Sequence, residues 1–288
     1  MPVVQVEVQL DRSYPEFSRL GAEIERVIHL VAPVVEDETA LTLPEEVPLR
    51  VMTPRGWQAF HAKRRRQQKR VDRELAPSVS KRAGFIVANA ILQRAERKWW
   101  RLIGIQALAD PIKPTRSEIL VMPAAVESRG LLCEEDWLIR EVSKHLTYVA
   151  QLWSGAQENP ALRDYAHPSL RGVDGRAQAW LNTGHCEWAA NRVTQALLGR
   201  TIAARPTDGH PTPEYLKALK FRERLESIRG WSDEGVGAIT ARIIDEVGLS
   251  AYNRVWFDAA LMPTAQETRN PDVWQARLQS ADHDHLPA

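Results

Sequence analysis

Apolar residues recur at helical spacing along most of the chain. In the first third, the apolar positions from Phe17 to Val31 predict a helix over about 14–31. Pro54 opens a second predicted helix, which carries Trp57. Three segments look extended: residues 1–10, where Val alternates with polar residues, and the short runs 48–52 and 119–122. Residues 83–109 are expected to be mostly helical.

The second half is more regularly helical. The pattern predicts helices at 133–153, 176–198, 212–228, 232–248 and 250–258, separated by breaks rich in Pro, Gly and Asp at 154–171 and 206–213. The predicted fold class is therefore mainly α (α+β), with a small mixed N-terminal part. We divide the chain into a strand and helix region with a basic helix (1–112), a helical region (113–276) and a disordered tail (277–288).

Composition limits the class of protein. The chain has 288 residues, of which 44% are hydrophobic and 26% charged, enough for a substantial core. Its net charge of +1 argues against a general polyanion-coating protein, and its two Cys exclude a disulfide framework or a Cys-rich zinc module. No stretch reaches the ~20 apolar residues of a membrane span, and Asp11 follows the start too soon for a signal peptide. We expect a soluble cytoplasmic protein with no membrane partner.

The helix predicted at 133–153 carries ionisable residues on one face. Its face residues follow helical spacing: Trp137, Arg140, Glu141, Lys144 and Tyr148. One interpretation is a solvated face with ion pairs at i,i+3 and i,i+4. The other is a ligand site, since an apolar packing stripe does not normally include so many ionisable groups.

The helix predicted at 176–198 contains a glycine where alanine would be more stable by about 1 kcal/mol. Gly184 therefore indicates close approach of another backbone. His185 and Glu187 follow it and are candidate functional residues, although each alone is more often a hydrogen-bonded structural residue.

Several segments in the same order resemble the zincin-like metallopeptidase family of actinobacteria once linked to coenzyme F420 biosynthesis. The resemblance covers roughly residues 115–276. It is carried by Ile119-Leu-Val-Met-Pro-Ala-Ala-Val-Glu-Ser, Trp137-Leu-Ile-Arg-Glu-Val-Ser-Lys144, Thr183-Gly-His-Cys-Glu187, Gly248-Leu-Ser-Ala-Tyr-Asn-Arg-Val-Trp256, Leu261-Met-Pro-Thr-Ala-Gln-Glu267 and Pro271-Asp-Val-Trp274. It implies a zincin-like helical fold.

The metal-ligand positions of that family are altered here. The family's His-Glu-x-x-His motif becomes Arg140-Glu141-x-x-Lys144, and its glutamate ligand on a second helix falls on Thr183. A guanidinium and an ammonium do not ligate zinc at neutral pH. His145 lies one residue past the second position and is rotated about 100° around the helix. We therefore expect no metal and no cofactor.

The charge pattern favours an anionic small-molecule substrate. Arg140 and Lys144 are expected to bind a sulfate, phosphate or carboxylate group, and Glu141 or His185 to remove a proton. Further substrate contacts are assigned to Tyr148, Thr183 and Glu187. Such a site supports elimination or intramolecular displacement, for example aziridine-type ring closure in bacterial specialised metabolism. Two alternatives stay open: a non-catalytic pseudoenzyme scaffold that binds a protein partner, and a zinc metallopeptidase.

A dense basic block lies on the helix that follows Pro54. Three interpretations remain open: binding of an acidic protein partner such as a carrier protein, binding of nucleic acid, or a solvated helix face. The near-neutral chain and the lack of a recognisable nucleic-acid-binding module count against nucleic acid. The candidate partner-binding residues are Lys63, Arg64, Arg65, Arg66, Lys69 and Arg70.

Overall fold

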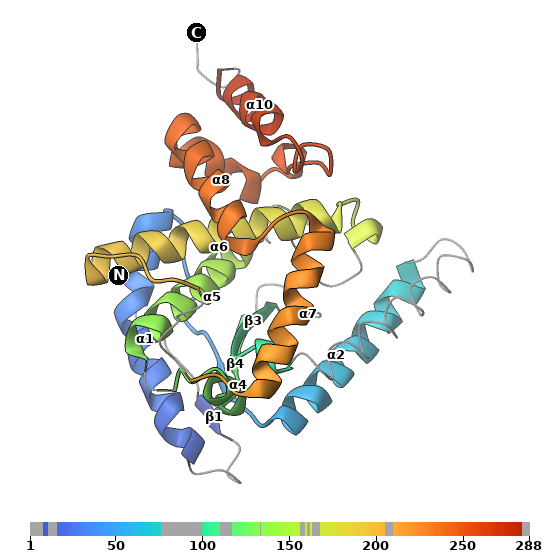
Figure 1. Ribbon diagram of the computed structural model, residues 1–288. Helices are drawn as coiled ribbons and strands as arrows, with labels where there is room; N and C mark the ends of the chain where they lie inside the picture. Colours follow the sequence, from blue (N-terminus) through green and yellow to red (C-terminus); the bar gives the residue numbers. More distant parts are fainter. Residues whose placement is uncertain are drawn as a thin grey trace.

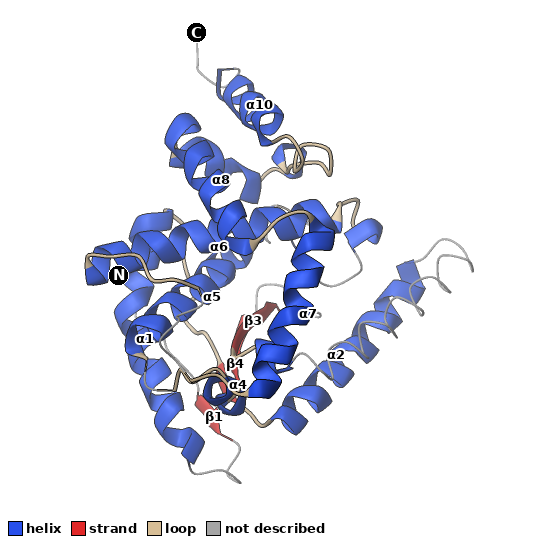
Figure 2. Ribbon diagram, viewed as in Figure 1, coloured by secondary structure: helices blue, strands red, loops and turns tan. Residues whose placement is uncertain are grey.

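The computed structural model is mainly helical, with a small mixed sheet (Figures 1 and 2). It describes residues 8–10, 16–75, 100–109, 117–132, 134–155, 159, 162, 168–204 and 210–283. The helices are α1 (Glu16–Thr39), α2 (Pro54–Leu75), α4 (Pro123–Ser128), α5 (Glu135–Gly155), α6 (Gly175–Leu198), α7 (Pro213–Arg229), α8 (Asp233–Val247), α9 (Leu249–Asn253) and α10 (Pro271–His283). Single 3-10 turns occur at η1 (Trp100–Leu102), η3 (Pro168–Leu170), η4 (Arg254–Trp256) and η5 (Ala259–Leu261).

The sheet has four described strands in the order β1-β2-β4-β3. Strands β1 (Val8–Leu10), β2 (Leu49–Val51) and β4 (Ser117–Val121) run parallel, and β3 (Ile105–Ala109) is antiparallel to β4. Strand β4 ends in three consecutive buried apolar residues, as expected for a strand covered on both faces, whereas in β2 the partly exposed Arg50 lies between buried Leu49 and Val51. Strand β3 is at one edge of the described sheet and lies beside α5.

Three helix contacts form the centre of the molecule: α5 against α6, α6 against α8, and α1 against α5. One cluster of buried apolar side chains extends along the chain from Leu20 to Leu278. Helix α1, from the predicted region 1–112, therefore shares its core with helices of the region 113–276. Helix α2 projects on one side of this body, and in this view α7 runs from near α6 down to α4, between α5 and α2 (Figure 1).

Helix α6 is fixed at both ends and in the middle. The Asp174 side chain caps its start by accepting from two backbone N–H groups, and Gly199 ends it with φ of 69°. At its midpoint, a Cβ added to Gly184 would lie 2.3 Å from Thr240 Oγ1 and 2.7 Å from Val236 Cγ1. The close backbone approach expected at Gly184 is thus confirmed, and its partner is α8.

The structure confirms most predicted elements and corrects two. The helices of the second half start and end within a few residues of the predicted bounds, except that the last is shorter, since α9 ends at Asn253. The mostly helical reading of 83–109 is wrong for 105–109, which form β3 because they pair with β4; residues 83–99 lie outside the described part.

The disordered tail predicted at 277–288 is wrong for 277–283, which form the end of α10. The Leu278 side chain is buried in the core, and Arg277 donates to Glu267. Residues 284–288 lie outside the described part. Among the described helices, none is long and apolar enough to cross a membrane.

Candidate functional site

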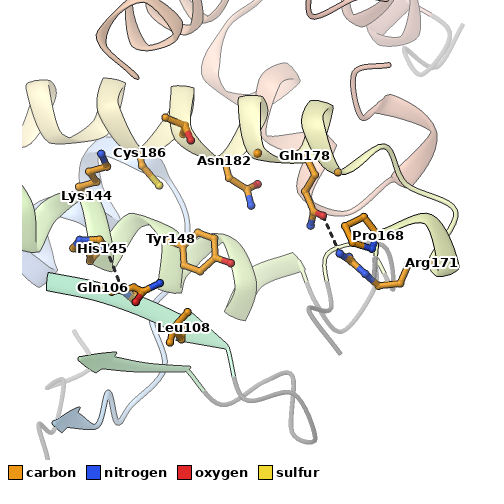
Figure 3. Close-up of a pocket in the computed structure, with 14 residues that line it drawn as sticks. Gln106, Leu108, Lys144, His145, Tyr148, Pro168, Arg171, Gln178, Asn182 and Cys186 are labelled. Atoms are coloured by element: carbon orange, nitrogen blue, oxygen red, sulfur yellow. Dashed lines mark hydrogen bonds between the residues drawn. The ribbon is translucent and has the colours of Figure 1, made fainter. Parts of the chain in front are cut away.

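A cavity of about 360 Å³ opens between α5, α6 and β3, with η3 at one end (Figure 3). This size lies at the lower end of the range for small-molecule sites. Its lining is polar on α5, and it mixes polar and apolar residues on α6 and β3. The described lining residues are Gln106, Ala107, Leu108, Lys144, His145, Tyr148, Pro168, Arg171, Gly175, Gln178, Ala179, Asn182, Thr183 and Cys186.

Three of the predicted site residues are in this lining. Lys144 and Tyr148 project from α5, and Thr183 faces them from α6. They meet because i and i+4 positions share one face of α5, and because α5 packs directly against α6. All three thus line one cavity, and their role in binding a substrate stays a prediction.

Lys144 sits at the junction of two ion pairs. Its ammonium donates to Glu187 Oε1, and its Nζ lies 3.7 Å from Asp233 Oδ2. Burial would lower the pKa of Lys144, but the surrounding carboxylates outweigh it and raise the pKa. The cation is therefore charged at neutral pH, and its side chain keeps 19% exposure.

Arg140 and Glu187 lie behind the cavity and do not line it. The Arg140 guanidinium is 1% exposed and donates to Glu187 Oε2, to Glu141 Oε1 at 3.1 Å, and through Nε to the Ile202 carbonyl at 2.8 Å. The Glu187 carboxylate is 1% exposed and is shared by Arg140 and Lys144. The prediction that both contact a substrate needs correction, because their polar atoms are already engaged by buried protein groups.

The Glu141 side chain is 12% exposed and does not belong to the described cavity lining. Burial would raise the pKa of Glu141, but Lys144 and Arg140 outweigh it and lower the pKa to about 2. Its Oε2 lies 3.9 Å from His145 Nε2. Glu141 is thus ionised over the whole physiological range and lies near the imidazole that lines the cavity.

His145 holds one ring nitrogen against β3. Its Nδ1 accepts from the Ala107 backbone N–H at 3.3 Å, which leaves the proton of the neutral ring on Nε2, toward Glu141. Burial is the main cause that lowers the pKa of His145 to about 4, so the ring is neutral at pH 7. In the sequence, His145 stands out only as a residue one position past a metal-ligand position; its i,i+4 spacing from Glu141 is the signal that places the two side chains close together.

His185 lies in the core and does not line the cavity. The ring is 0% exposed, and it stacks against Trp188 and Tyr252 at centroid distances of 5.2 and 5.4 Å. Its Nδ1 lies 2.9 Å from Gln151 Nε2, and burial lowers its pKa to about 3. The predicted role of His185 as a substrate base is therefore wrong for this cavity: aromatic packing places the ring elsewhere.

Sequence reasoning missed the residues at the far end of the cavity. Arg171, directly after η3, lines it there and donates to Gln178 Oε1 on α6 at 3.0 Å. Asn182 lies on the same side of α6 (Figure 3). Arg171 belongs to a stretch that the sequence marks only as a break between helices, so no periodic pattern could single it out.

The residues at the three positions that correspond to zincin metal ligands in the sequence resemblance, Arg140, Lys144 and Thr183, do not fit a divalent metal ion. Two of them are cations, and both bind the Glu187 carboxylate that a metal would otherwise compete for. Thr183 provides only a neutral hydroxyl, a poor substitute for a carboxylate or imidazole. Within the described ranges, no group of three or more His, Cys, Asp or Glu side chains is arranged to hold a metal.

The basic block lies on α2, and its side chains are unequal. Lys63, Arg66 and Arg70 are exposed, and Arg70 pairs with Glu74 at 3.1 Å. Arg65 and Lys69 are partly exposed. Arg64 is only 9% exposed, so it belongs to the packed side of α2 and not to a partner-binding face. The remaining candidates stay a prediction.

Comparison with known proteins identifies a fold and no family. No protein-family model matches the chain, and no curated sequence matches it. A solved structure, described as "Crystal structure of a putative hydrolase with a novel fold from Chloroflexus aurantiacus", aligns with 94% of this chain and 91% of that chain. The TM-score is 0.53 and the sequence identity 18%, so the likeness shows a common fold.

Proposed function

We propose that the protein is an enzyme that binds an anionic small molecule in the α5–α6 cavity and acts on it without a metal at Arg140, Lys144 and Thr183. The observation that carries the proposal is the charge of the described lining: Lys144 and Arg171 face the cavity, and no carboxylate does. Cationic donors in a partly buried cavity favour sulfate, phosphate or carboxylate groups. The resemblance to zincin-like metallopeptidases and the neighbour described as a hydrolase add support for an enzyme.

Lys144 can turn to a ligand without leaving either of its carboxylate partners unpaired. Each of its two carboxylate partners has a second cation: Glu187 is also bound by Arg140, and Asp233 accepts from Arg222 at 2.5 Å. When the ammonium contacts a substrate anion, neither carboxylate is left unpaired. This matters because an uncompensated buried charge costs several kcal/mol. Arg140 and Arg222 thus act as positioning residues that keep Lys144 available.

The chemistry we propose is elimination or intramolecular displacement. In displacement, a group of the substrate attacks a carbon that bears sulfate or phosphate, and the carbon–oxygen bond breaks with its electron pair leaving on the oxyanion. Lys144 stabilises that developing charge. The proton lost by the attacking group passes to water in the cavity, because the unprotonated nitrogen of His145 already accepts from the Ala107 N–H and His185 does not line the cavity. Ring closure by an amine, as in aziridine formation, is one such reaction.

A second function is favoured by a separate observation. The chain of ion pairs from Arg140 through Glu187, Lys144 and Asp233 to Arg222 connects α5, α6, α8 and α7. A pseudoenzyme scaffold would retain such a network for its architecture alone. The acidic carrier protein proposed as a partner for α2 is compatible with either function.

Calorimetric titration with sulfate and phosphate at constant ionic strength tests the proposal. Wild type should bind one of these anions, Lys144→Gln should bind it at least ~10-fold more weakly, and Lys144→Arg should keep much of the affinity, since one charged hydrogen bond contributes about 1.5–3 kcal/mol. The matched control is Arg224→Gln, which removes an exposed cation of α7 outside the cavity lining.

Circular dichroism and urea unfolding establish that each variant is folded. Equal anion affinity in wild type and Lys144→Gln would overturn the proposal, as would the absence of binding in wild type. Either result would leave the scaffold function.

A further inference from the structure

The cavity has a cation at each end. Lys144 and His145 stand at one end, and Arg171 with Pro168 stands at the other, with α6 along one wall (Figure 3). The two cations come from elements separated in sequence by the end of α5 and the segment that follows it. The positive charge of the described lining is therefore located at two separate ends of the cavity, at Lys144 and at Arg171.

Arg171 is held in its position by its backbone and its side chain. Its N–H donates to the Pro168 carbonyl at 2.9 Å, and the Val173 N–H donates to the same carbonyl at 3.1 Å. The guanidinium donates to Gln178 Oε1, and the Gln178 side chain is 9% exposed. A turn closed by two hydrogen bonds and a side chain anchored to α6 reduce the entropy lost when the guanidinium binds a ligand.

The wall between the two ends is neutral and polar. Tyr148 projects from α5 and Asn182 points toward it from α6 (Figure 3), and Thr183 of α6 also lines the cavity. The Asn182 Oδ1 atom is buried and accepts no hydrogen bond from the described residues. A buried amide oxygen is normally paired. The middle of the cavity is therefore suited to a hydrogen-bond donor of the ligand, such as a hydroxyl or an ammonium group.

From this arrangement we propose that the substrate carries an anionic group at each end, one bound by Lys144 and the other by Arg171, with a hydrogen-bond donor between them that faces Asn182. This inference rests on the proposed function and names its substrate class: a small dianion, such as a hydroxy or amino diacid or a phosphorylated or sulfated acid. A cavity of about 360 Å³ accommodates a molecule of that size. Lys144 binds the anionic group that leaves. Arg171 binds the other anionic group, and the separation of the two cations therefore determines the length of substrate that fits.

Two anchors on one molecule have a measurable consequence. Once one anion is bound, the second binds at an effective concentration set by the spacer, so affinity depends sharply on length. A dianion of the right length should bind much more tightly than a monoanion of the same length. Charge alone, without a second anchor, would give no optimum length.

The test uses two matched sets of probes on the full chain, with titration calorimetry at constant ionic strength. The dicarboxylates are succinate, glutarate and adipate; the monocarboxylates are butyrate, valerate and hexanoate. For wild type, one dicarboxylate should bind at least ~10-fold more tightly than its monocarboxylate. Arg171→Gln should abolish that ratio and leave the monocarboxylate affinity within about twofold, since one charged contact is lost and the other kept.

Two further variants distinguish a local effect at Arg171 from a general loss of structure. Gln178→Ala removes the anchor of Arg171 and should reduce the ratio partly, while Arg224→Gln should leave it unchanged. Malate should bind more tightly than succinate in wild type and lose that advantage in Asn182→Leu, since the donor between the anions then has no acceptor.

The two proposals fail in different ways. If monocarboxylates bind and depend on Lys144, but no dicarboxylate has an advantage or the advantage survives Arg171→Gln, the dianion inference is overturned and the proposed function stands. If neither set of probes binds to wild type and sulfate and phosphate also do not, the proposed function fails together with it.

Discussion

The α5–α6 helix pair has a polar side and an aromatic side, and each contains a histidine with a lowered pKa. His145 lies on the polar side, where it lines the cavity between Lys144 and β3. His185 lies on the aromatic side, enclosed by Trp188, Tyr252 and Trp256 with no exposed surface. Both imidazoles are neutral at pH 7 because of burial, yet only the first has access to a ligand.

The comparison shows that a shifted pKa does not by itself mark a functional group. On the aromatic side, the lowered pKa of His185 results from burial in the core, where the imidazole ring packs against aromatic side chains. On the polar side it occurs beside a cavity and an ion-pair network in which two cations share the Glu187 carboxylate. Variants on the aromatic side should change stability and spare binding, whereas variants in the cavity lining should do the reverse.

The largest effect should come from the shared carboxylate. Glu187→Gln leaves the buried Arg140 and the partly buried Lys144 without their common anion, and removing one partner of a buried pair costs about 3–5 kcal/mol. Urea unfolding at pH 7 measures this loss. The double variant Arg140→Gln/Glu187→Gln should recover part of it. A single variant as stable as wild type would show that the network does not hold the helices together.

The aromatic side should respond nearly as strongly. His185→Ala removes a fully buried ring from between three aromatic side chains and should lower the unfolding free energy by about 2–4 kcal/mol. Sulfate affinity should be unchanged in the folded variant, because the ring does not line the cavity. A loss of affinity greater than threefold at full folding would contradict the separation of the two sides.

The contact between α6 and α8 offers a smaller effect away from both histidines. Gly184→Ala places a Cβ 2.3 Å from Thr240 Oγ1 and 2.7 Å from a methyl group of Val236. Both neighbours are β-branched and stiff, so we expect a destabilisation of about 1–3 kcal/mol. Thr240→Ala in the same chain should relieve part of it. Unchanged thermal stability of Gly184→Ala would show that α8 moves away easily.

The two histidines also predict how stability depends on pH. Their folded-state pKa values, about 4 for His145 and about 3 for His185, lie below the unfolded value of 6.5. The unfolded chain therefore binds more protons as pH falls below about 6.5, and stability decreases from there toward pH 4. Each histidine contributes a slope of up to about 1.4 kcal/mol per pH unit.

His145→Gln isolates one of these contributions. As the pH is lowered from 6 to 5, the unfolding free energy of this variant should decrease less than that of wild type. The expected difference is about 1.4 kcal/mol per pH unit, the contribution of one proton. Urea unfolding at several pH values measures both slopes. Equal slopes would mean that His145 is protonated in the folded protein.

Periodic features of this molecule were predictable from sequence, and contacts between distant elements were not. The helices, the shared face of Lys144 and Tyr148, and the close approach at Gly184 all follow from spacing or from a residue with an unusual local cost. The sharing of Glu187 by Arg140 and Lys144 depends on the rotation of α5 against α6, which spacing within one helix does not determine.

Two site residues show the same limit more sharply. His185 looks functional beside Gly184, but side chains far along the chain, Tyr252 and Trp256, decide that it is buried. Arg171 looks like a loop residue, and only the packing of η3 near α6 brings it to the cavity. In both, the chemistry is set by tertiary contacts that leave no periodic signal.

The most direct test of the central claim follows the Lys144 ammonium itself. In protein labelled with ¹⁵N at lysine Nζ, the Lys144 signal is assigned by its absence from Lys144→Arg, and sulfate is then titrated at constant ionic strength. We predict a saturable shift of the Lys144 signal with the dissociation constant found by calorimetry, while exposed lysines such as Lys217 and Lys220 shift only slightly and without saturation. A Lys144 signal that stays in place while sulfate binds, or no binding at all, would contradict an anion site at this cation.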